Sequence, residues 1–249
     1  MSGSKLWIYG IVITALFGCR DPRSVRAIRE GDSAESQAMI SAGADVNTSD
    51  STGSTALCVA IDAGDKDTFR KLLKKGASPN LCDDVGTSAI HLAAEQQDIF
   101  WLEVVLKNEG NPNLPNTGNS VFPNDTPIFY AIYKQRSENV LLLMAAGADV
   151  NHVDGNHNTP LYACMKVGMY DLMMKMIAAG AKPAPPKPAF SIFENGWFTE
   201  GYEKFLLEPK MRLQYLELRA MLIEKGYMWD ELGMLREKKE DAANTIREK

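Results

Sequence analysis

Residues with side chains suited to covalent or metal chemistry are scarce in this sequence. The 249 residues include three histidines and four cysteines. His152 and His157 lie five positions apart in a region expected to be a loop, which is a poor spacing for a metal pair. The sequence contains no Gly-x-Ser-x-Gly, Gly-x-Gly-x-x-Gly, P-loop, His-Glu-x-x-His or Cys-x-x-Cys pattern. We therefore expect a protein that is not an enzyme and that holds no cofactor and no metal.

One catalytic alternative stays open in the C-terminal region. Residues 190–249 contain several glutamates, a residue type that serves as general acid or base, namely Glu194, Glu200, Glu203 and Glu208. The same region has no histidine and no cysteine. An unrecognised active site there is therefore a weak hypothesis.

Composition indicates a folded, mildly acidic chain. Hydrophobic residues make up 45% and charged residues 24%, as in ordinary globular proteins. The formal net charge of −5 gives no electrostatic support for nucleic-acid binding. Four scattered cysteines are too few for a disulfide scaffold. We expect a protein partner and no nucleic-acid partner.

The sequence segments that would position any functional residue recur at regular intervals along the chain. The phrase Gly-Ala-Asp-Val-Asn, first seen from Gly43, returns in full or in part four more times. Its glycines are Gly43, Gly76, Gly110, Gly147 and Gly180, at spacings of 33, 34, 37 and 33. A second phrase begins twelve residues after most of these glycines, at Thr55, Ser88 and Thr159. Its copy at Thr126 follows Gly110 by sixteen residues, which predicts a third copy that is four residues longer.

These two linked phrases resemble the ankyrin repeat, whose consensus pairs Thr-Pro-Leu-His with Gly-Ala-Asp-Val-Asn. The resemblance covers residues 23–183. It implies an all-α fold, an ankyrin-repeat solenoid of about five helix–turn–helix repeats with short β-hairpin-like fingers. It also implies that His91, which stands at the consensus histidine, braces its turn by hydrogen bonding.

The residue types explain why such a pattern folds. Thr55, Ser88, Thr126 and Thr159 are suited to cap the first helix of each repeat, and Pro127 and Pro160 suit the first helical turn. We expect the five repeat glycines, Gly110 included, to end the second helices in a left-handed conformation. Each helix pair is too small to bury its apolar side alone, so the pairs must stack.

The first twenty residues differ from the repeats. Lys5 precedes a twelve-residue apolar run from Leu6 to Phe17. As a helix this run would rise about 18 Å, short of the roughly 30 Å hydrocarbon core of a bilayer. A secretory signal fits that length better than a spanning helix. A buried helix remains an alternative.

The end of this run resembles the lipobox of bacterial lipoproteins, since Leu16 is followed by Phe17, Gly18 and Cys19. In that family the signal is removed before the cysteine, whose thiol then carries a lipid. The resemblance implies residues 1–18 as the signal peptide and Cys19 as the lipidation site. Because Arg20 and not aspartate follows the cysteine, it implies a periplasmic protein anchored to the outer membrane. A plain signal peptide is the other interpretation.

The C-terminal third departs from the repeats. The proline-rich run from Pro183 predicts an extended segment. A helix is expected from about Pro209 to Lys225, with Leu213, Leu216, Ala220 and Ile223 on one face, as a helical C-terminal cap. The expected domains are residues 1–18 as signal peptide, 19–22 as lipidated tether, 23–183 as ankyrin repeats, 184–235 as linker and cap, and 236–249 as charged tail.

In ankyrin proteins the partner usually meets the finger tips and the adjoining ends of the first helices. Carried over by position, this resemblance implies partner-binding residues Asp50, Asp62, Asp83, Asp84, Glu95, Phe122, Tyr133, Lys134, Asp154, His157 and Lys166. Phe122 stands in the longer third finger, where it either inserts into a partner or folds back onto the next repeat. His157 stands where sister fingers have glycine, so we expect a left-handed backbone there. For the charged residues the other interpretation is a solvated loop.

Ankyrin repeats together with a lipobox resemble the immunity lipoproteins that guard against phospholipase (lipase) effectors of type VI secretion systems. The resemblance implies a membrane-anchored periplasmic immunity protein that binds one toxin in a 1:1 complex and neutralises it through its concave face. The alternative is a generic periplasmic ankyrin scaffold for an envelope complex. A fold alone does not decide between them.

Overall fold

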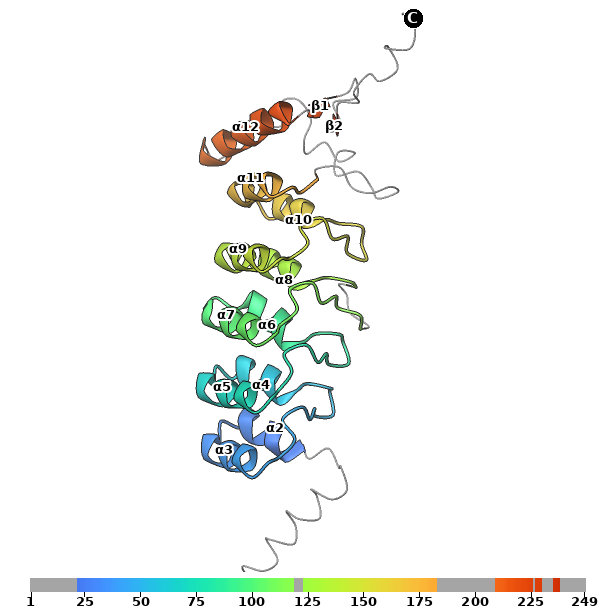
Figure 1. Ribbon diagram of the computed structural model, residues 1–249. Coiled ribbons are helices and arrows are strands. Elements are labelled where there is room, and N and C mark those ends of the chain that lie inside the picture. The colour runs from blue at the N-terminus through green and yellow to red at the C-terminus, as the bar shows by residue number, and fades with distance from the viewer. Residues whose placement is uncertain (1–21, 119–122, 183–208, 226, 230–234, 238–249) are drawn as a thin grey trace, which may run out of the picture. The chain divides into compact units, whose positions relative to one another are not determined.

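The computed structural model describes residues 22–118, 123–182, 209–225, 227–229 and 235–237 (Figure 1). The described chain falls into two compact units, divided after Ala148, which are called unit 1 and unit 2 below. The helix pairs of unit 1 are α2 (Pro22–Arg29) with α3 (Ser33–Ser41), α4 (Ala56–Asp62) with α5 (Lys66–Lys74), α6 (Ala89–Glu95) with α7 (Phe100–Lys107), and α8 (Pro127–Tyr133) with α9 (Ser137–Ala145). Unit 2 contains α10 (Pro160–Lys166), α11 (Tyr170–Ala178), α12 (Pro209–Glu224), β1 (Tyr227–Trp229) and β2 (Leu235–Glu237).

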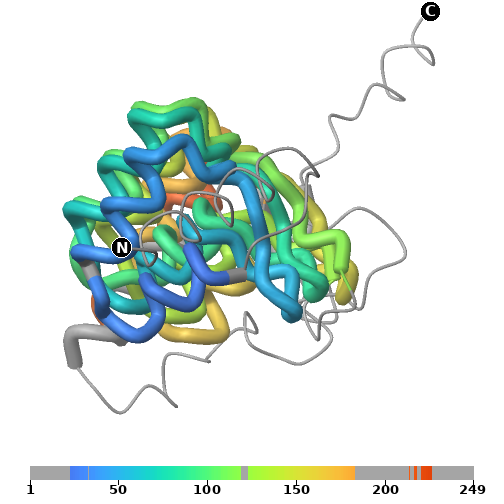
Figure 2. The backbone as a smooth tube through the Cα atoms, turned by 90° about the horizontal axis from the view of Figure 1, so that it is seen from below, coloured from blue at the N-terminus to red at the C-terminus, as the bar shows by residue number. Residues whose placement is uncertain are grey.

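Unit 1 is a stack of helix pairs. The first helices form one layer, in which α2 contacts α4, α4 contacts α6, and α6 contacts α8. Seen along the stack, the pairs from blue to green lie over one another, and their fingers project to the same side (Figure 2). Side chains from successive pairs fill the core between the layers, including the fully buried Phe69, Ile90, Leu102, Phe129 and Leu143. Stacking thus buries the apolar sides that no single pair could cover.

The predicted caps begin the first helices. Thr55, Ser88, Thr126 and Thr159 are the N-cap residues of α4, α6, α8 and α10. The Thr55 hydroxyl accepts a hydrogen bond from the backbone N–H of Cys58 at 3.3 Å, and Thr159 accepts one from Tyr162 at 3.3 Å. Proline occupies the first helical turn of α8 and α10. The capping prediction is therefore confirmed for Thr55 and Thr159, whereas Thr126 stands at the N-cap without a capping hydrogen bond from its side chain.

Four of the five repeat glycines end a second helix as predicted. Gly43, Gly76, Gly147 and Gly180 have φ between 87° and 98°. The prediction for Gly110 was wrong, because Glu109 has the left-handed φ of 65° instead. Gly110 donates to Val105 O at 3.0 Å, just as Ala77 donates to Leu72 O at 3.0 Å.

Gly110 therefore stands in the place of Ala77 and not in that of Gly76. A Cβ on Gly110 would lie 2.4 Å from Val105 Cγ1, so glycine is kept there by close packing. Counted from Glu109, Thr126 follows after seventeen residues (126 − 109) instead of twelve. The third finger is thus five residues longer than its sisters and not four.

Asparagine side chains join each repeat to the next. The amide of Asn80 accepts from Asn111 N at 2.8 Å and donates to Glu109 O at 2.9 Å. Asn47 and Asn113 make corresponding bonds within unit 1, to Ser78 N and Gly147 O respectively. The asparagine of the repeat phrase therefore satisfies backbone groups of the following loop, which explains why it recurs.

Unit 2 holds the last helix pair and the predicted C-terminal helix. α12 contacts α11, and its Leu222 is 1% exposed. The face predicted to pack, containing Leu213, Leu216, Ala220 and Ile223, is instead exposed. β1 and β2 form an antiparallel pair that the sequence analysis did not anticipate, with Met228 opposite Arg236.

Several predictions fall outside the described residues. These are the signal peptide, the lipidation site Cys19, the proline-rich segment, Phe122 and most of the charged tail. Within the described ranges, none of the helices has the length and hydrophobicity needed to cross a bilayer.

Candidate protein-binding face

Each finger turns around one polar side chain, which is aspartate in three of the four fingers before α4, α6, α8 and α10. In the second finger (residues 80–88), Asp83 Oδ1 accepts from Val85 N at 3.0 Å and from Thr87 N at 2.8 Å. Asp50 accepts from Thr52 N at 2.8 Å and from Ser54 N at 3.1 Å in the same way. These two carboxylates hold the turn that precedes the first helix.

Asp50 has a further partner in the preceding repeat, because the Arg29 guanidinium donates to its carboxylate. Burial acts to raise the pKa of Asp50, but the hydrogen bonds from Thr52, Arg29 and Ser54 outweigh it and lower the pKa to about 2. Asp50 therefore stays ionised and engaged inside the protein. Its predicted role in partner binding competes with these contacts.

The third finger (residues 113–126) uses an amide where its sisters use a carboxylate. Asn116 lies 33 residues after Asp83. Its N–H donates to Asp125 O at 2.8 Å, matching the bond from Asp83 N to Thr87 O at 2.8 Å. The Asn116 amide donates to Tyr130 Oη at 2.6 Å, and Asn116 is fully buried. The side chain that closes this finger is thus tied to helix α8.

The fingers of unit 1 lie close enough to exclude side-chain atoms between them. A Cβ on Gly53 would meet Asp84 Oδ1 at 2.6 Å. A Cβ on Gly86 would meet Asn116 Oδ1 at 2.2 Å and Gly118 N at 2.3 Å. Glycine at both sites lets neighbouring fingers touch through their backbones, which gives the tips fixed positions relative to one another.

The second finger carries the exposed apolar side chains of unit 1. Among the described residues of that unit, the large hydrophobic residues that are exposed are Leu81 (39%) and Val85 (50%). Asp84 between them is exposed as well, whereas Asp83 is half-buried. The tip of the second finger therefore presents two apolar side chains beside an exposed carboxylate, a composition typical of protein–protein interfaces.

The C-terminal ends of the first helices bring four predicted residues together in a row, which is called the helix-end row below: Asp62, Glu95, Tyr133 and Lys134. Lys134 Nζ lies 3.5 Å from Glu95 Oε2. Burial raises the pKa of Asp62, and the negative charge of Glu95 raises it further. Asp62 and Lys134 are exposed, while Glu95 and Tyr133 are half-buried. The row therefore presents charge of both signs.

The remaining predicted residues lie in unit 2. Asp154 Oδ1 accepts from Asn158 N at 2.6 Å and from Asn156 N at 2.8 Å, and Asp154 is 3% exposed. Its carboxylate is thus inside the finger and not at its surface, contrary to its expected place. His157 is exposed and has the predicted left-handed backbone, with φ of 61°. Lys166 is exposed at the end of α10, with Nζ 5.7 Å from the Tyr162 ring centroid.

Asp125, at the end of the third finger, is also buried, at 1% exposure. Four residues of the face were missed altogether: Leu81, Val85, Asn116 and Arg136. Arg136 Nε donates to Glu95 O at 3.0 Å, which ties α6 to the start of α9. The 33-residue step from Asp83 to Asn116 is the signal that would have found the amide.

His91 braces its turn as predicted. Its Nδ1 accepts from Ser88 N at 3.2 Å, and its Nε2 lies 3.0 Å from Leu114 O, to which it donates. The side chain is fully buried, and burial lowers its pKa to about 4. The neutral imidazole is therefore a structural link between the second and third fingers.

The three cysteines that the structure describes, Cys58, Cys82 and Cys164, lack the features of reactive thiols. Burial raises the pKa of Cys58 to about 11 and raises that of Cys164 further above its usual range. Cys82 is exposed, but desolvation and Asp83 also raise its pKa. Within the described ranges, no cluster of three His, Cys, Asp or Glu side chains is arranged to hold a metal ion.

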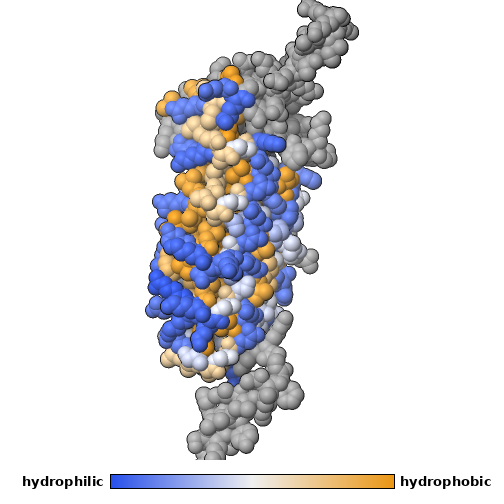
Figure 3. Space-filling model, viewed as in Figure 1, coloured by the Kyte–Doolittle hydropathy of each residue, from blue (hydrophilic) through white to orange (hydrophobic). Residues whose placement is uncertain are grey.

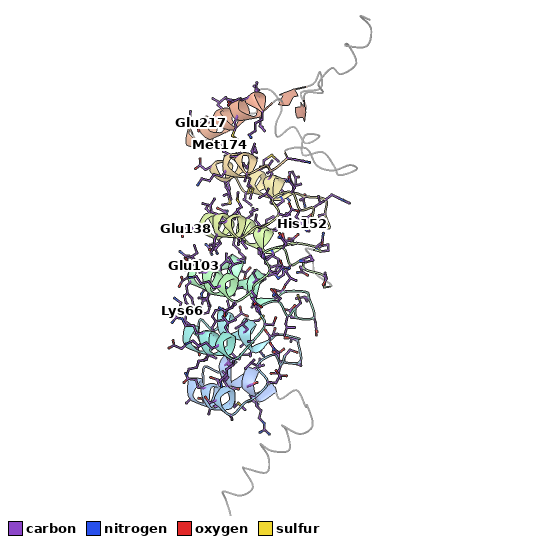
Figure 4. All side chains as sticks on the ribbon, viewed as in Figure 1. Lys66, Glu103, Glu138, His152, Met174 and Glu217 are labelled. Atoms are coloured by element: carbon purple, nitrogen blue, oxygen red, sulfur yellow. The ribbon has the colours of Figure 1, made fainter. Side chains whose placement is uncertain are left out.

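The opposite side of unit 1 is polar. Figure 4 shows Lys66, Glu103 and Glu138 along the second helices, facing away from the fingers. Hydrophilic residues cover much of the surface around α3 and α5 (Figure 3). On α5 the exposed cations are Lys66, Arg70, Lys71 and Lys74. This side offers charge without an apolar centre, unlike the second finger.

Comparison with known proteins bears on the repeats. Residues 25–116 match the model of the ankyrin-repeat family, which includes three repeat copies. No curated protein matches the chain. Ankyrin repeats are generally non-catalytic scaffolds for protein–protein interaction, and the matched segment contains the first two fingers and the residues Asp62 and Glu95. Residues 25–116 are therefore ankyrin repeats, and the described helix pairs have the all-α fold of an ankyrin-repeat solenoid.

Proposed function

We propose that this protein is a membrane-anchored periplasmic immunity protein, which binds a lipase effector of a type VI secretion system and blocks it. The observation that carries the binding part is the second finger, where Leu81 and Val85 are exposed beside Asp84. Apolar groups at the centre of an interface supply most of its affinity, and charged groups at its rim speed association. The helix-end row supplies such charges.

The mechanism is occlusion by a pre-formed surface. Close glycine contacts fix the finger tips before the partner arrives, so binding does not have to order them. The proposed complex is 1:1, with the tips and the helix-end row covering the entrance to the active site of the lipase. Nothing in this mechanism requires a reaction by the immunity protein itself.

The lipase partner and the anchor rest on sequence. Ankyrin repeats behind a Leu-x-Gly-Cys ending at Cys19 resemble immunity lipoproteins of type VI phospholipase effectors. Anchoring in the outer membrane would place the inhibitor where a secreted lipase begins its attack. Two or more acyl chains hold a protein on a membrane durably, whereas one chain gives marginal binding.

The binding experiment searches the genes beside that of this chain for a lipase and pairs the full chain with its product. Calorimetry should give a 1:1 complex, and phospholipid hydrolysis should stop at one equivalent. Leu81→Ser combined with Val85→Asp should weaken binding at least about tenfold. The matched control, Lys71→Glu with Lys74→Glu on the opposite side, should leave affinity unchanged.

The outcomes separate immunity from scaffolding. Binding without inhibition would favour the generic periplasmic scaffold, and no binding would reject the lipase as the partner. An affinity that is insensitive to the second finger would move the interface to another surface.

The anchor has its own test. Cys19→Ala should abolish incorporation of labelled palmitate and release the protein from the membrane fraction, while its thermal unfolding stays unchanged. Continued palmitate labelling of this variant would refute the proposed lipid anchor without affecting the binding proposal.

A further inference from the structure

Helix α12 has two opposite apolar sides, only one of which is covered. Leu222 is 1% exposed in the helix that packs against α11. Leu213 lies nine residues earlier, about two and a half helical turns, and therefore on the opposite side. Leu213 is 58% exposed, Leu216 41% and Ile223 54%, and Ala220 is exposed with them. Figure 3 shows hydrophobic residues at the surface of α12 among hydrophilic ones.

A helix with apolar residues on both sides has the pattern of a helix placed between two neighbours. Among the described residues, α11 packs along α12, and the short strand β1 contacts it as well. Exposing Leu213, Leu216 and Ile223 to water is unfavourable by about 25 cal/mol for each Å² of apolar surface. The uncovered side, which is called the α12 stripe below and consists of Leu213, Leu216, Ala220 and Ile223, therefore favours an occupant.

The spacing of the α12 stripe identifies the kind of occupant. Its residues are separated by three, four and three positions, which is the a and d pattern of a coiled-coil heptad. With Leu213 and Ala220 at a, and Leu216 and Ile223 at d, the flanking positions follow. Arg212 and Arg219 stand at g, and Glu217 and Glu224 stand at e.

The charges at these flanking positions define an orientation. In a parallel pair of helices, a g residue of one helix lies beside the e residue of the following heptad on the other. Both g positions of α12 are basic and both e positions are acidic. A second copy of α12 in parallel register would therefore match arginine with glutamate on both sides of the seam. An antiparallel copy would bring g beside g and e beside e, so that like charges meet.

We propose that the α12 stripe is a self-association surface, which pairs with the α12 stripe of a second copy of this chain as a short parallel coiled coil. The proposal rests on the exposed a and d residues and on the matching of g with e, and it is independent of the lipase partner. Two heptads bury little area, so the dimer is weak and forms at high protein concentration.

The test measures the mass of the full chain in solution, kept soluble in the same mild detergent throughout. Sedimentation equilibrium up to about 1 mM protein, a concentration that detects weak pairing, should show a shift from the 27.5 kDa chain toward twice that mass. Ala220→Ile fills an exposed a position with a side chain favoured in two-stranded coils, and it should tighten the dimer at least about tenfold. Leu216→Ser should weaken the dimer by a similar factor.

A pair of charge variants tests the partner and the orientation together. Arg212→Glu with Arg219→Glu should remain monomeric, and so should Glu217→Arg with Glu224→Arg, because each places like charges across the seam. Mixing the two variants should restore pairing. A matched change on another helix, Lys71→Glu with Lys74→Glu, should leave the parent's dimer unaffected.

Three results would overturn the proposal. A parent chain that stays monomeric to 1 mM would mean that another segment of the chain or a different protein covers the α12 stripe. A dimer that is indifferent to Ala220→Ile and to Leu216→Ser would lie elsewhere on the molecule. Charge variants that each pair with themselves as well as with one another would exclude the parallel register.

Discussion

The second and third fingers of unit 1 close the same turn with different chemistry. In the second finger a carboxylate, that of Asp83, accepts two backbone N–H groups within its own loop. In the third finger an amide, that of Asn116, donates to Tyr130 on the following helix and accepts from Gly118 N at 3.2 Å. The polar side chain that closes the second finger thus bonds within its own loop, whereas the one that closes the third finger also bonds to a neighbouring helix.

The difference follows from loop length. Five additional residues separate Asn116 from Thr126, so a local carboxylate no longer reaches both sides of the turn. Contacts from outside the loop replace it, namely Tyr130 from α8, His91 from α6 and the backbone of Gly86 in the second finger. The backbone pattern is kept, since Asn124 N donates to Asn116 O at 2.7 Å as Gly86 N donates to Asp83 O at 3.0 Å. The described ends of the longer loop therefore keep the backbone bonds of their sisters and add contacts with other repeats.

The contact between the two fingers is most sensitive at Gly86. Gly86→Ala places a Cβ 2.2 Å from Asn116 Oδ1 and adds strain at a φ of 83°. We expect a loss of about 3 kcal/mol in the free energy of unfolding, because backbone atoms must move to relieve the overlap. Urea denaturation followed by circular dichroism measures this loss.

Gly76→Ala is the matched control for that substitution. Gly76 has nearly the same φ, 88°, but its Cβ would meet nothing within 4 Å. Strain alone should cost about 1 kcal/mol there. Equal losses at the two positions would contradict a tight contact between the second and third fingers.

The pH dependence of folding should report the link that His91 makes between the fingers. The pKa of His91 is about 4 in the folded protein and about 6.5 when unfolded. The unfolded state therefore binds more protons between these values, so stability is complete above pH 6.5 and falls as the pH drops toward 4. Between pH 7.5 and pH 5 this group should remove about 2 kcal/mol from the free energy of unfolding.

Denaturation at the two pH values isolates this contribution when the parent is compared with His91→Gln, which does not titrate. The variant is less stable at both values, but its loss on acidification should be about 2 kcal/mol smaller than that of the parent. An identical pH dependence in the two proteins would mean that protonated His91 is tolerated in the folded state.

The sequence predicted the features that all repeats share and missed the features in which single repeats differ. Caps, helix pairs and the left-handed His157 follow from residue types whose preferences are local. Gly110 was assigned to the position that ends the second helix because it matches the glycine of the repeat phrase, whereas Glu109, one residue earlier, occupies that position. Its close packing against Val105 shows that Gly110 belongs to the following position. Asp83 was expected to meet a partner because of its position at a finger tip, whereas its carboxylate accepts hydrogen bonds from the backbone of its own loop.

The α12 stripe was misplaced for a related reason. A helix with apolar residues on two sides offers two candidate faces, and the pattern alone does not say which one meets α11. Leu222 is buried, whereas Leu213, Leu216 and Ile223 are exposed. Which side packs is decided by tertiary contacts and not by the helix itself.

The smallest effect tests how the third finger depends on α8. Tyr130→Phe removes the hydroxyl that Asn116 Nδ2 reaches at 2.6 Å and leaves a fully buried amide without that partner. We expect a loss of about 1 kcal/mol in the free energy of unfolding, measured by urea denaturation, because an unsatisfied buried donor costs about that much or somewhat more. Repeating the substitution in an Asn116→Ala background should give almost no further loss, since the donor is already gone. Asp83 closes its turn with backbone N–H groups of its own loop, and the second finger reaches Tyr130 only through Thr87 Oγ1, which lies 3.4 Å from Tyr130 Oη. Asp83→Ala should therefore couple to Tyr130→Phe less strongly than Asn116→Ala does. Coupling between Asp83 and Tyr130 as strong as that between Asn116 and Tyr130 would show that the two fingers are closed as one unit, and the contrast between them would fail.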